Sequence, residues 1–325
     1  MSYSIRHFRN TDTAHLTRIW NLHHSASRSC DPISNSVFDS CVIAKSFFDA
    51  EDLLILEDES RPLGFVHIGF GCDEAKSKVD FKQALIACLC VEPHRDEEVI
   101  ADSLINAAID RIEKRGSSDV IAIGSPSRYA FYIGVAAGDG LMGVVASDSR
   151  LQRWLVHNRF EPIRPTECWE VDLASFRPPM DRGQFAVRRA ASVVRVLDEL
   201  QEDWWDAVVL GHTEQIRFQL YSRQQNAITN EVSFWYTDQA FSGISSQAAR
   251  IWLPLFPEDV EGRDRYVFLL SEAFRQLQSE RFSTVRAIAA PDQQANVSVL
   301  QRLSFRSVEH GLVFRRQLSP QLKLA

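Results

Sequence analysis

Hydrophobic positions recur at helical spacing in two long segments, one in each half of the chain. Residues 84–116 and 249–282 each begin with an apolar run, pass through an acidic turn and continue as an amphipathic helix. The apolar helix faces are Ile100, Leu104, Ile105, Ala108, Ile109 and Ile112 in the first segment, and Tyr266, Leu269, Leu270, Ala273, Phe274 and Leu277 in the second. A run rich in β-formers follows each helix, at 119–124 and 284–290. The pattern therefore predicts a strand, a helix and a second strand, in that order, in each half of the chain.

The ends of the two halves are also similar. Residues 3–20 and 185–200 each read as a short strand followed by a helix, with Ile5-Arg6 and Val187-Arg188 as the matching strand residues. Residues 155–173 and 300–318 each lead from a helix end through an aromatic, Phe160 or Phe305, into a last strand. We therefore expect an α/β protein with a mixed sheet in each of two domains, residues 1–175 and 182–325. The linker is expected at 174–184, which contains a Pro pair and a Gly.

Composition narrows the function classes. The chain has 325 residues, a net charge of −7 and a pI near 5.8, which argues against a general nucleic-acid binder. The first residues are charged, and no apolar run approaches the roughly 18 residues that span a bilayer. We therefore expect a cytoplasmic protein with no membrane partner. The six cysteines form no CxxC pair, and we expect them to be small buried residues.

The order of these elements resembles the GNAT superfamily of N-acetyltransferases, once in each half. The match is closer in the second half, over residues 271–316, where Leu303-Ser304-Phe305 stands at the turn before the closing strand. The resemblance implies two GNAT domains in tandem, acetyl-CoA as the acyl donor, and a small-molecule or peptide amine as the acceptor. It does not indicate an oligomeric state.

The resemblance also implies a donor site in the second half. The central strand there is expected to contain Pro254, which would interrupt the ladder and open a gap for pantetheine beside Leu253 and Leu255. An ordinary edge-strand proline is the alternative. The pyrophosphate is expected at the N-terminus of the next helix, where backbone N–H groups favour an anion. The expected contacts there are Gly262, Arg263, Asp264, Arg265 and Tyr266.

The two turns differ in charge and in glycine content. Of the family's phosphate-binding glycines, the second half keeps one position, Gly262, together with Arg263 and Arg265. The first half has none, and Asp96, Glu97 and Glu98 would repel a phosphate while stabilising a helix N-terminus. The first turn is therefore predicted to be a capped helix start, and the second either an altered phosphate site or a solvated charged turn.

Catalytic residues are less clearly marked. Glu231, on the strand expected beside the central one, is the candidate general base, with a solvent-facing carboxylate as the alternative. His67 is the counterpart candidate in the first half, with a core or surface histidine as the alternative. The tyrosine that many family members use as the acid is replaced by Leu155 and Leu300. His23 and His24 are adjacent on a helix and so point about 100° apart, so we expect no metal site.

Two functions follow from these observations. The first is acetyl transfer from acetyl-CoA to an amine, favoured by Gly262, Pro254 and the two arginines of the second turn. The second is a catalytically inactive tandem GNAT-fold protein that binds a ligand or partner, favoured by the missing glycines and tyrosines.

Overall fold

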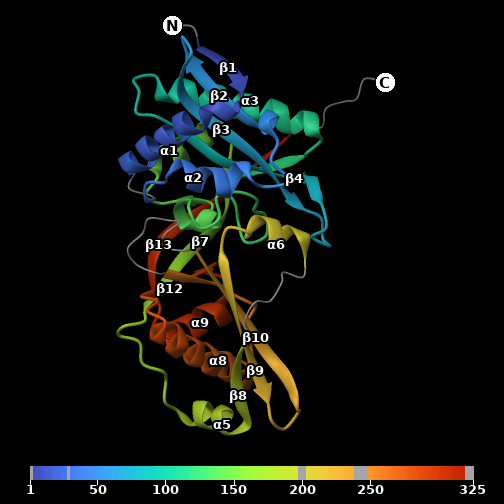
Figure 1. The fold of residues 1–325 in the computed structure, drawn as a ribbon, viewed down its shortest axis with the longest axis vertical. Coiled ribbons are helices and arrows are strands. Elements are labelled where there is room, and N and C mark those ends of the chain that lie inside the picture. The colour runs from blue at the N-terminus through green and yellow to red at the C-terminus, as the bar shows by residue number, and fades with distance from the viewer. Residues whose placement is uncertain (1–2, 28–29, 197–202, 238–247, 319–325) are drawn as a thin grey trace. The chain divides into compact units, whose positions relative to one another are not determined.

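The chain folds into two compact units. The computed structural model describes residues 3–27, 30–196, 203–237 and 248–318. Unit 1 comprises residues 1–165, 201–212 and 311–325, and unit 2 comprises residues 166–200 and 213–310. Each unit is a mixed sheet with helices, as Figure 1 shows, which confirms the predicted α/β class. The units interleave along the sequence, so they do not test the single boundary predicted at 175–182. That boundary remains a prediction about where each half of the chain ends.

Unit 1 is built on a sheet of order β1-β2-β3-β4-β5-β13, with β6 also paired to β13. Its strands are β1 (Tyr3–His7), β2 (Leu53–Asp58), β3 (Arg61–Cys72), β4 (Val79–Val91), β5 (Asp119–Ala122), β6 (Val144–Val145) and the end of β13 (Arg306–Gln317). Its helices are α1 (Thr13–Ser27), α2 (Asn35–Phe38), α3 (Glu97–Arg115), α4 (Ser149–His157) and α6 (Trp204–Val209), with short turns η1 (Asn10–Asp12), η2 (Asp39–Ile43), η3 (Ala50–Asp52) and η4 (Ala137–Gly140).

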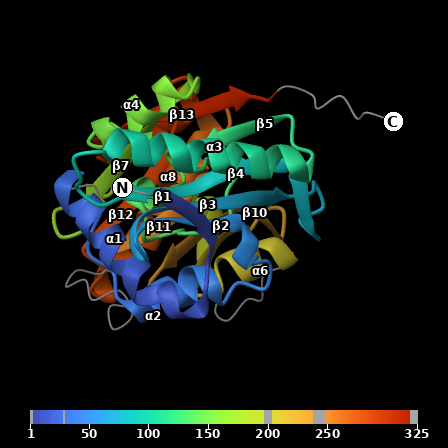
Figure 2. The same ribbon diagram turned by 90° about the horizontal axis from the view of Figure 1, so that it is seen from above.

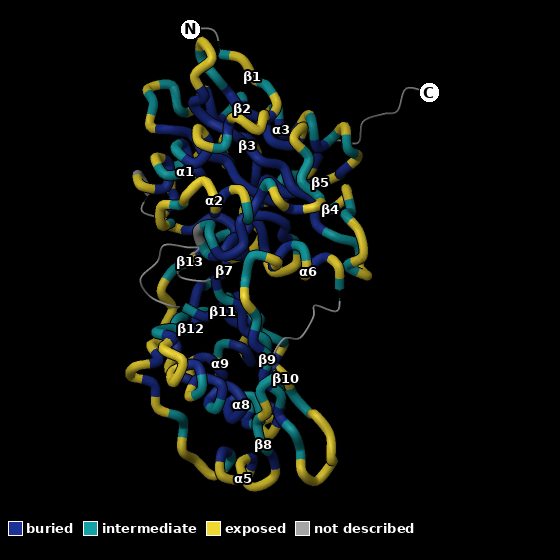
Figure 3. Tube along the Cα trace, in the orientation of Figure 1, coloured by how far each residue is buried: buried dark blue, intermediate teal, exposed yellow. Residues whose placement is uncertain are grey.

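Helix α3 forms as its sequence predicts. All six positions of the predicted apolar face are buried, and Gly116 ends the helix in a left-handed conformation with φ 91°. The helix covers one face of the unit 1 sheet, and α1 and α2 cover the opposite face (Figure 2). Figure 3 shows the resulting burial, which is most continuous along the strands between these two helical layers.

Unit 2 is built on a sheet of order β7-β12-β11-β10-β9-β8. Its strands are β7 (Glu161–Asp172), β8 (Ala191–Val196), β9 (Glu214–Ser222), β10 (Ala227–Tyr236), β11 (Ala248–Trp252) and β12 (Thr284–Ala289), and its helices are α5 (Arg182–Ala190), α8 (Val260–Ser279) and α9 (Gln294–Arg302). The apolar face of α8 is buried in the core, with Tyr266 half-buried at its edge.

Each unit contains segments from the other half of the sequence. The end of β13 pairs with β5, Phe314 lying opposite Ala122, and so completes the unit 1 sheet. Helix α6 also belongs to unit 1, where Trp205 stacks on Phe47. The buried Lys45 ammonium donates to the carbonyls at the end of α6. The first 165 residues are therefore not a complete folding unit by themselves.

Two local predictions were wrong. Val187-Arg188 lies in helix α5 rather than in a strand, because Asp181 caps that helix at Gln184 N and Val187 packs into the unit 2 core; the strand begins at Ala191. Pro254 does not lie inside a strand, because β11 ends at Trp252. No helix among the described residues is both long enough and apolar enough to cross a membrane.

Candidate functional site

Strands β4 and β5 diverge in unit 1. They pair in parallel from Ala84 to Ile86 on β4, and beyond that point the pairing ends. On the other side of β4 the register with β3 shifts, so that Ala87 has no residue opposite it. A bulge of this kind leaves backbone groups outside the ladder. The gap between two parallel strands is therefore open at the end of β5.

Backbone strain marks the same point. Ile123, the residue after β5, has φ 73°, which is rare for a β-branched side chain. Gly124 follows with φ 155°, and a Cβ there would lie 2.4 Å from the Gly140 carbonyl oxygen. Strained conformations of this kind cluster at functional sites.

A small cavity lies in this gap. Its volume is about 30 Å³, and apolar groups form nearly all of its wall. The lining residues are Trp20, His24, Ala87, Cys88, Leu89, Ile123, Ala136, Gly143, Val144, Val145, Asp148 and Leu151. The space holds about two water-sized spheres, which suits a short apolar group.

The next helix, α3, has no side-chain cap at its N-terminus. Two of the three acidic residues predicted to cap it, Asp96 and Glu97, have other partners. Asp96 accepts a hydrogen bond from the Tyr3 hydroxyl at 2.8 Å, which holds the pKa of that carboxyl below its usual range. Glu97 forms an ion pair with Arg150 at 2.6 Å. The predicted capped start in the first half is therefore not observed.

The corresponding gap in unit 2 is filled by the protein itself. Strands β11 and β12 pair in parallel up to Ile251 and Ala287. The buried Asn296 side chain donates to the Pro254 carbonyl at 3.1 Å and accepts the Phe256 N–H at 3.1 Å. These are backbone groups of the segment expected to contact pantetheine. Of the two residues predicted to line that arm, Leu253 is half-buried against the core and Leu255 is 79% exposed.

The predicted phosphate turn of unit 2 is also occupied. Asp259 caps α8 by accepting the Gly262 N–H at 2.7 Å. Gly262 is needed for close packing, because a Cβ there would lie 2.7 Å from Pro257 Cβ. Arg263 donates to the Glu258 carbonyl, and the turn is closed by its own groups.

The other residues of this turn that were predicted to contact acetyl-CoA also have partners within the protein. Arg265 pairs with Glu261 on the helix surface. Asp264 is buried and accepts from Arg302, while Tyr266 packs on Phe256 with ring centroids 4.8 Å apart. The role of these residues in donor binding remains a prediction.

Glu231 lies on β10 with its side chain 54% exposed. Its carboxylate is 3.7 Å from Arg217 and accepts from Gln219 at 3.4 Å, both on the neighbouring β9. The structure therefore places the predicted base on a solvent-facing stretch of the sheet, and its catalytic role also remains a prediction.

A buried polar cluster borders the unit 1 cavity. His23 and His24 converge although they are adjacent, with ring centroids 4.9 Å apart. Cys88 and Cys90 lie on β4 with Sγ atoms 3.5 Å apart. Asp148 lies 3.3 Å from His23 Nε2. Burial lowers the pKa of His24 to about 3, so its imidazole is neutral at pH 7.

His67 belongs to a second buried pair. Its Nδ1 lies 3.0 Å from the Tyr132 hydroxyl, and Tyr132 stacks on the cavity residue Trp20. Tyr132 also has a positive φ of 61°. Nothing in the sequence signalled Tyr132, because its partners lie far away along the chain.

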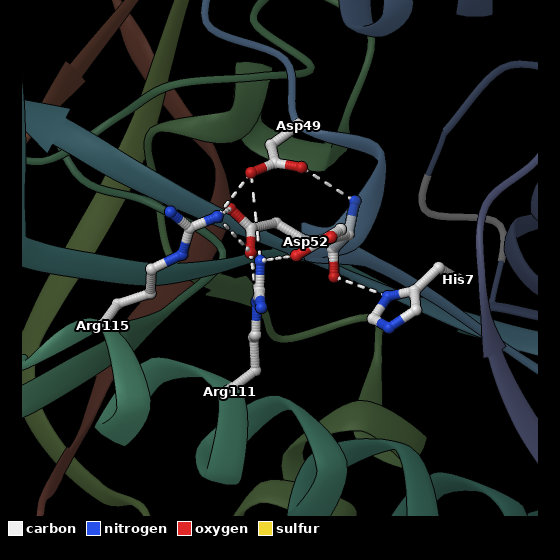
Figure 4. Close-up of polar contacts among 6 residues, drawn as sticks. His7, Asp49, Asp52, Arg111 and Arg115 are labelled. Carbon is white, nitrogen blue, oxygen red and sulfur yellow. Dashed lines mark hydrogen bonds and ion pairs between the residues drawn. The ribbon is translucent and has the colours of Figure 1, made fainter.

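A larger cavity, of about 390 Å³, lies elsewhere in unit 1 and is walled by phenylalanines together with Asp49, Asp52 and Arg115. Arg111 donates to Asp52 at 2.7 Å and Arg115 pairs with both aspartates, as Figure 4 shows. These carboxylates are neutralised by the arginines of α3, so they fix that helix to the turn before β2.

Comparisons with known proteins agree on the fold. No protein-family model and no curated protein matches the chain. Among solved structures, it is similar to a tandem GNAT protein from the clavulanic acid biosynthesis pathway, at 13% identity and a TM-score of 0.63, over 98% of this chain and 100% of that one. A GCN5-related N-acetyltransferase from Sphaerobacter thermophilus matches at 10% identity and a TM-score of 0.61, over 99% and 98% of the two chains. Another from Anabaena variabilis matches at 10% identity and a TM-score of 0.58, over 98% and 73%. The chain has the tandem GNAT fold that its sequence predicts.

Proposed function

We propose that this protein is an acyl-CoA-dependent N-acyltransferase whose donor site lies in unit 1. The observation that carries the proposal is the divergence of β4 and β5 around an apolar cavity, followed by a helix without a side-chain cap. This half of the chain is not the one that the sequence favoured. Two of the similar structures are GCN5-related N-acetyltransferases, and this similarity supports the reaction class.

In this proposal the backbone does most of the binding. The Glu97 N–H donates to the His94 carbonyl, so the N–H groups that follow it in the first turn of α3 attract the pyrophosphate, and the backbone around the Ala87 bulge contacts the pantetheine arm. The acyl group enters the cavity, whose size favours acetyl over a long chain. The nitrogen of a neutral amine attacks the thioester carbonyl, and N–H groups freed by the bulge stabilise the oxyanion. The C–S bond then breaks, the proton of the attacking nitrogen passes to the departing CoA thiolate or to solvent, and the products are the amide and CoA.

Unit 2 has a different role in this proposal. Asn296 and Asp259 occupy the positions at which a donor would bind, so unit 2 acts as a binding or supporting module. The second function expected from the sequence, a catalytically inactive GNAT-fold protein that binds a ligand or partner, would then apply to unit 2 alone. The competing arrangement uses Leu253, Leu255 and the 262–266 turn for acetyl-CoA, with Glu231 as the base. The acceptor is a small-molecule or peptide amine, and we propose a cytoplasmic location.

Calorimetric titration with acetyl-CoA separates these arrangements. Ala136→Phe adds a ring to the unit 1 cavity from a loop, and we expect it to weaken binding at least about 10-fold. Leu255→Ala removes an exposed side chain of the predicted unit 2 site, and we expect no change. Weaker acetyl-CoA binding by Leu255→Ala, together with unchanged binding by Ala136→Phe, would place the donor site in unit 2. Thiol release in the presence of small amines and peptides then tests turnover: binding without release supports the inactive alternative.

A further inference from the structure

Helix α1 and strand β4 bring two imidazoles and a thiol together in the interior of unit 1. One donor atom from each of His23, His24 and Cys90 lies within 4.8 Å of the other two, and all three residues are buried. His24 Nε2 and Cys90 Sγ are 3.8 Å apart. Ligand atoms around a tetrahedral zinc ion, with bonds of about 2.0 to 2.3 Å, are separated by about 3.3 to 3.8 Å. The three groups therefore need only small side-chain movements to share one ion.

A carboxylate completes the set. Asp148 Oδ2 lies 3.3 Å from His23 Nε2, which is the spacing of two ligands on one ion. Its other oxygen, Oδ1, accepts the Leu151 N–H at 3.1 Å, and this bond holds the carboxylate in place. His23 Nδ1 lies 3.3 Å from the Val91 carbonyl oxygen and 3.4 Å from the Val91 N, so it donates to the carbonyl when it carries the ring proton and accepts the N–H when it does not. Histidines that bind metals through one nitrogen are commonly oriented in this way through the other.

We propose that His23, His24, Cys90 and Asp148 form a site for a divalent transition-metal ion, with Zn²⁺ as the preferred ion. Nitrogen and sulfur donors select zinc over magnesium or calcium. Binding releases the Cys90 thiol proton to solvent, and the thiolate and carboxylate then balance the two charges of the ion. A neutral site avoids the cost of burying net charge. The ion ties α1 to β4, and two of its ligands, His24 and Asp148, also line the cavity proposed for the acyl group.

The test uses the full-length chain stripped with a chelator. Zn²⁺ is added in competition with a chromophoric chelator, and Co²⁺ is added separately as a spectroscopic substitute. We expect one ion per chain and a thiolate-to-cobalt charge-transfer band. Cys90→Ser should remove the band and lower the Zn²⁺ affinity at least about 100-fold, and Asp148→Asn, which keeps the capping oxygen, should lower it about 10- to 100-fold. Cys168→Ser is the matched buried control in unit 2 and should change neither quantity.

Two results would overturn the site: no Zn²⁺ retained by the wild-type chain, or equal retention by the wild type and Cys90→Ser. If Cys90→Ser does not fold, the wild-type Co²⁺ spectrum decides, because a spectrum without a thiolate band excludes Cys90 as a ligand.

Discussion

The Asp259 carboxylate accepts the backbone N–H of Gly262 at 2.7 Å, so the chain itself caps the N-terminus of α8. Loss of an N-cap costs about 0.5 to 2 kcal/mol. We expect Asp259→Ala to lower the free energy of unfolding of unit 2 by that amount, and Asp259→Asn to keep most of it. Urea unfolding, followed by hydrogen exchange in α8, measures the effect. Acetyl-CoA affinity should be the same in both variants; tighter binding by Asp259→Ala would show that a donor competes with this carboxylate.

The end of β13 completes the unit 1 sheet, while the residue just before β13 packs in unit 2. Substitutions at these two places should therefore destabilise different units. Phe314 is buried in the unit 1 core, and Phe305, just before β13, is buried in the unit 2 core. Each change to Ala should cost about 3 to 5 kcal/mol. Hydrogen exchange should show lost protection in β5 for Phe314→Ala and in β12 for Phe305→Ala. If both variants lost protection in β12 alone, β13 would not complete the unit 1 sheet.

Burial of His67 predicts acid sensitivity. Burial lowers the pKa of His67 to about 3, against about 6.5 in an unfolded chain. Between these values the unfolded state binds a proton that the folded state does not bind, so stability falls as the pH falls. The loss is about 1.4 kcal/mol per pH unit, or about 2 kcal/mol from pH 6.5 to 5.

Urea unfolding between pH 7.5 and 5 tests this prediction. His67→Gln should remove this part of the pH dependence, while His15→Gln, at an exposed position, should keep it. An unchanged pH dependence in His67→Gln would show that His67 does not titrate in this way.

The sequence predicted the fold well because the apolar periodicity of α3 and α8 and the β-rich runs beside them are local signals. It failed where a distant contact decides the structure. Val187 is helical because its helix packs into the unit 2 core, and nothing near Val187 reveals that packing.

The site was harder to predict for the same reason. The bond from Asn296 to the Pro254 carbonyl and the approach of His24 to Cys90 join residues far apart along the chain. One local signal was readable, since Asp259 stands three residues before Gly262 in the arrangement typical of a helix N-cap.

The central claim is that α3, and not α8, receives the pyrophosphate. Glu98 and Glu261 are exposed carboxylates at the second position of the two helices, which makes them a matched pair. Calorimetric titration of Glu98→Lys and Glu261→Lys with acetyl-CoA at low salt tests the claim directly. We predict roughly 3- to 10-fold tighter binding for Glu98→Lys, because the local charge changes by two, and no change for Glu261→Lys. Tighter binding for Glu261→Lys alone would contradict the claim and place the donor in unit 2.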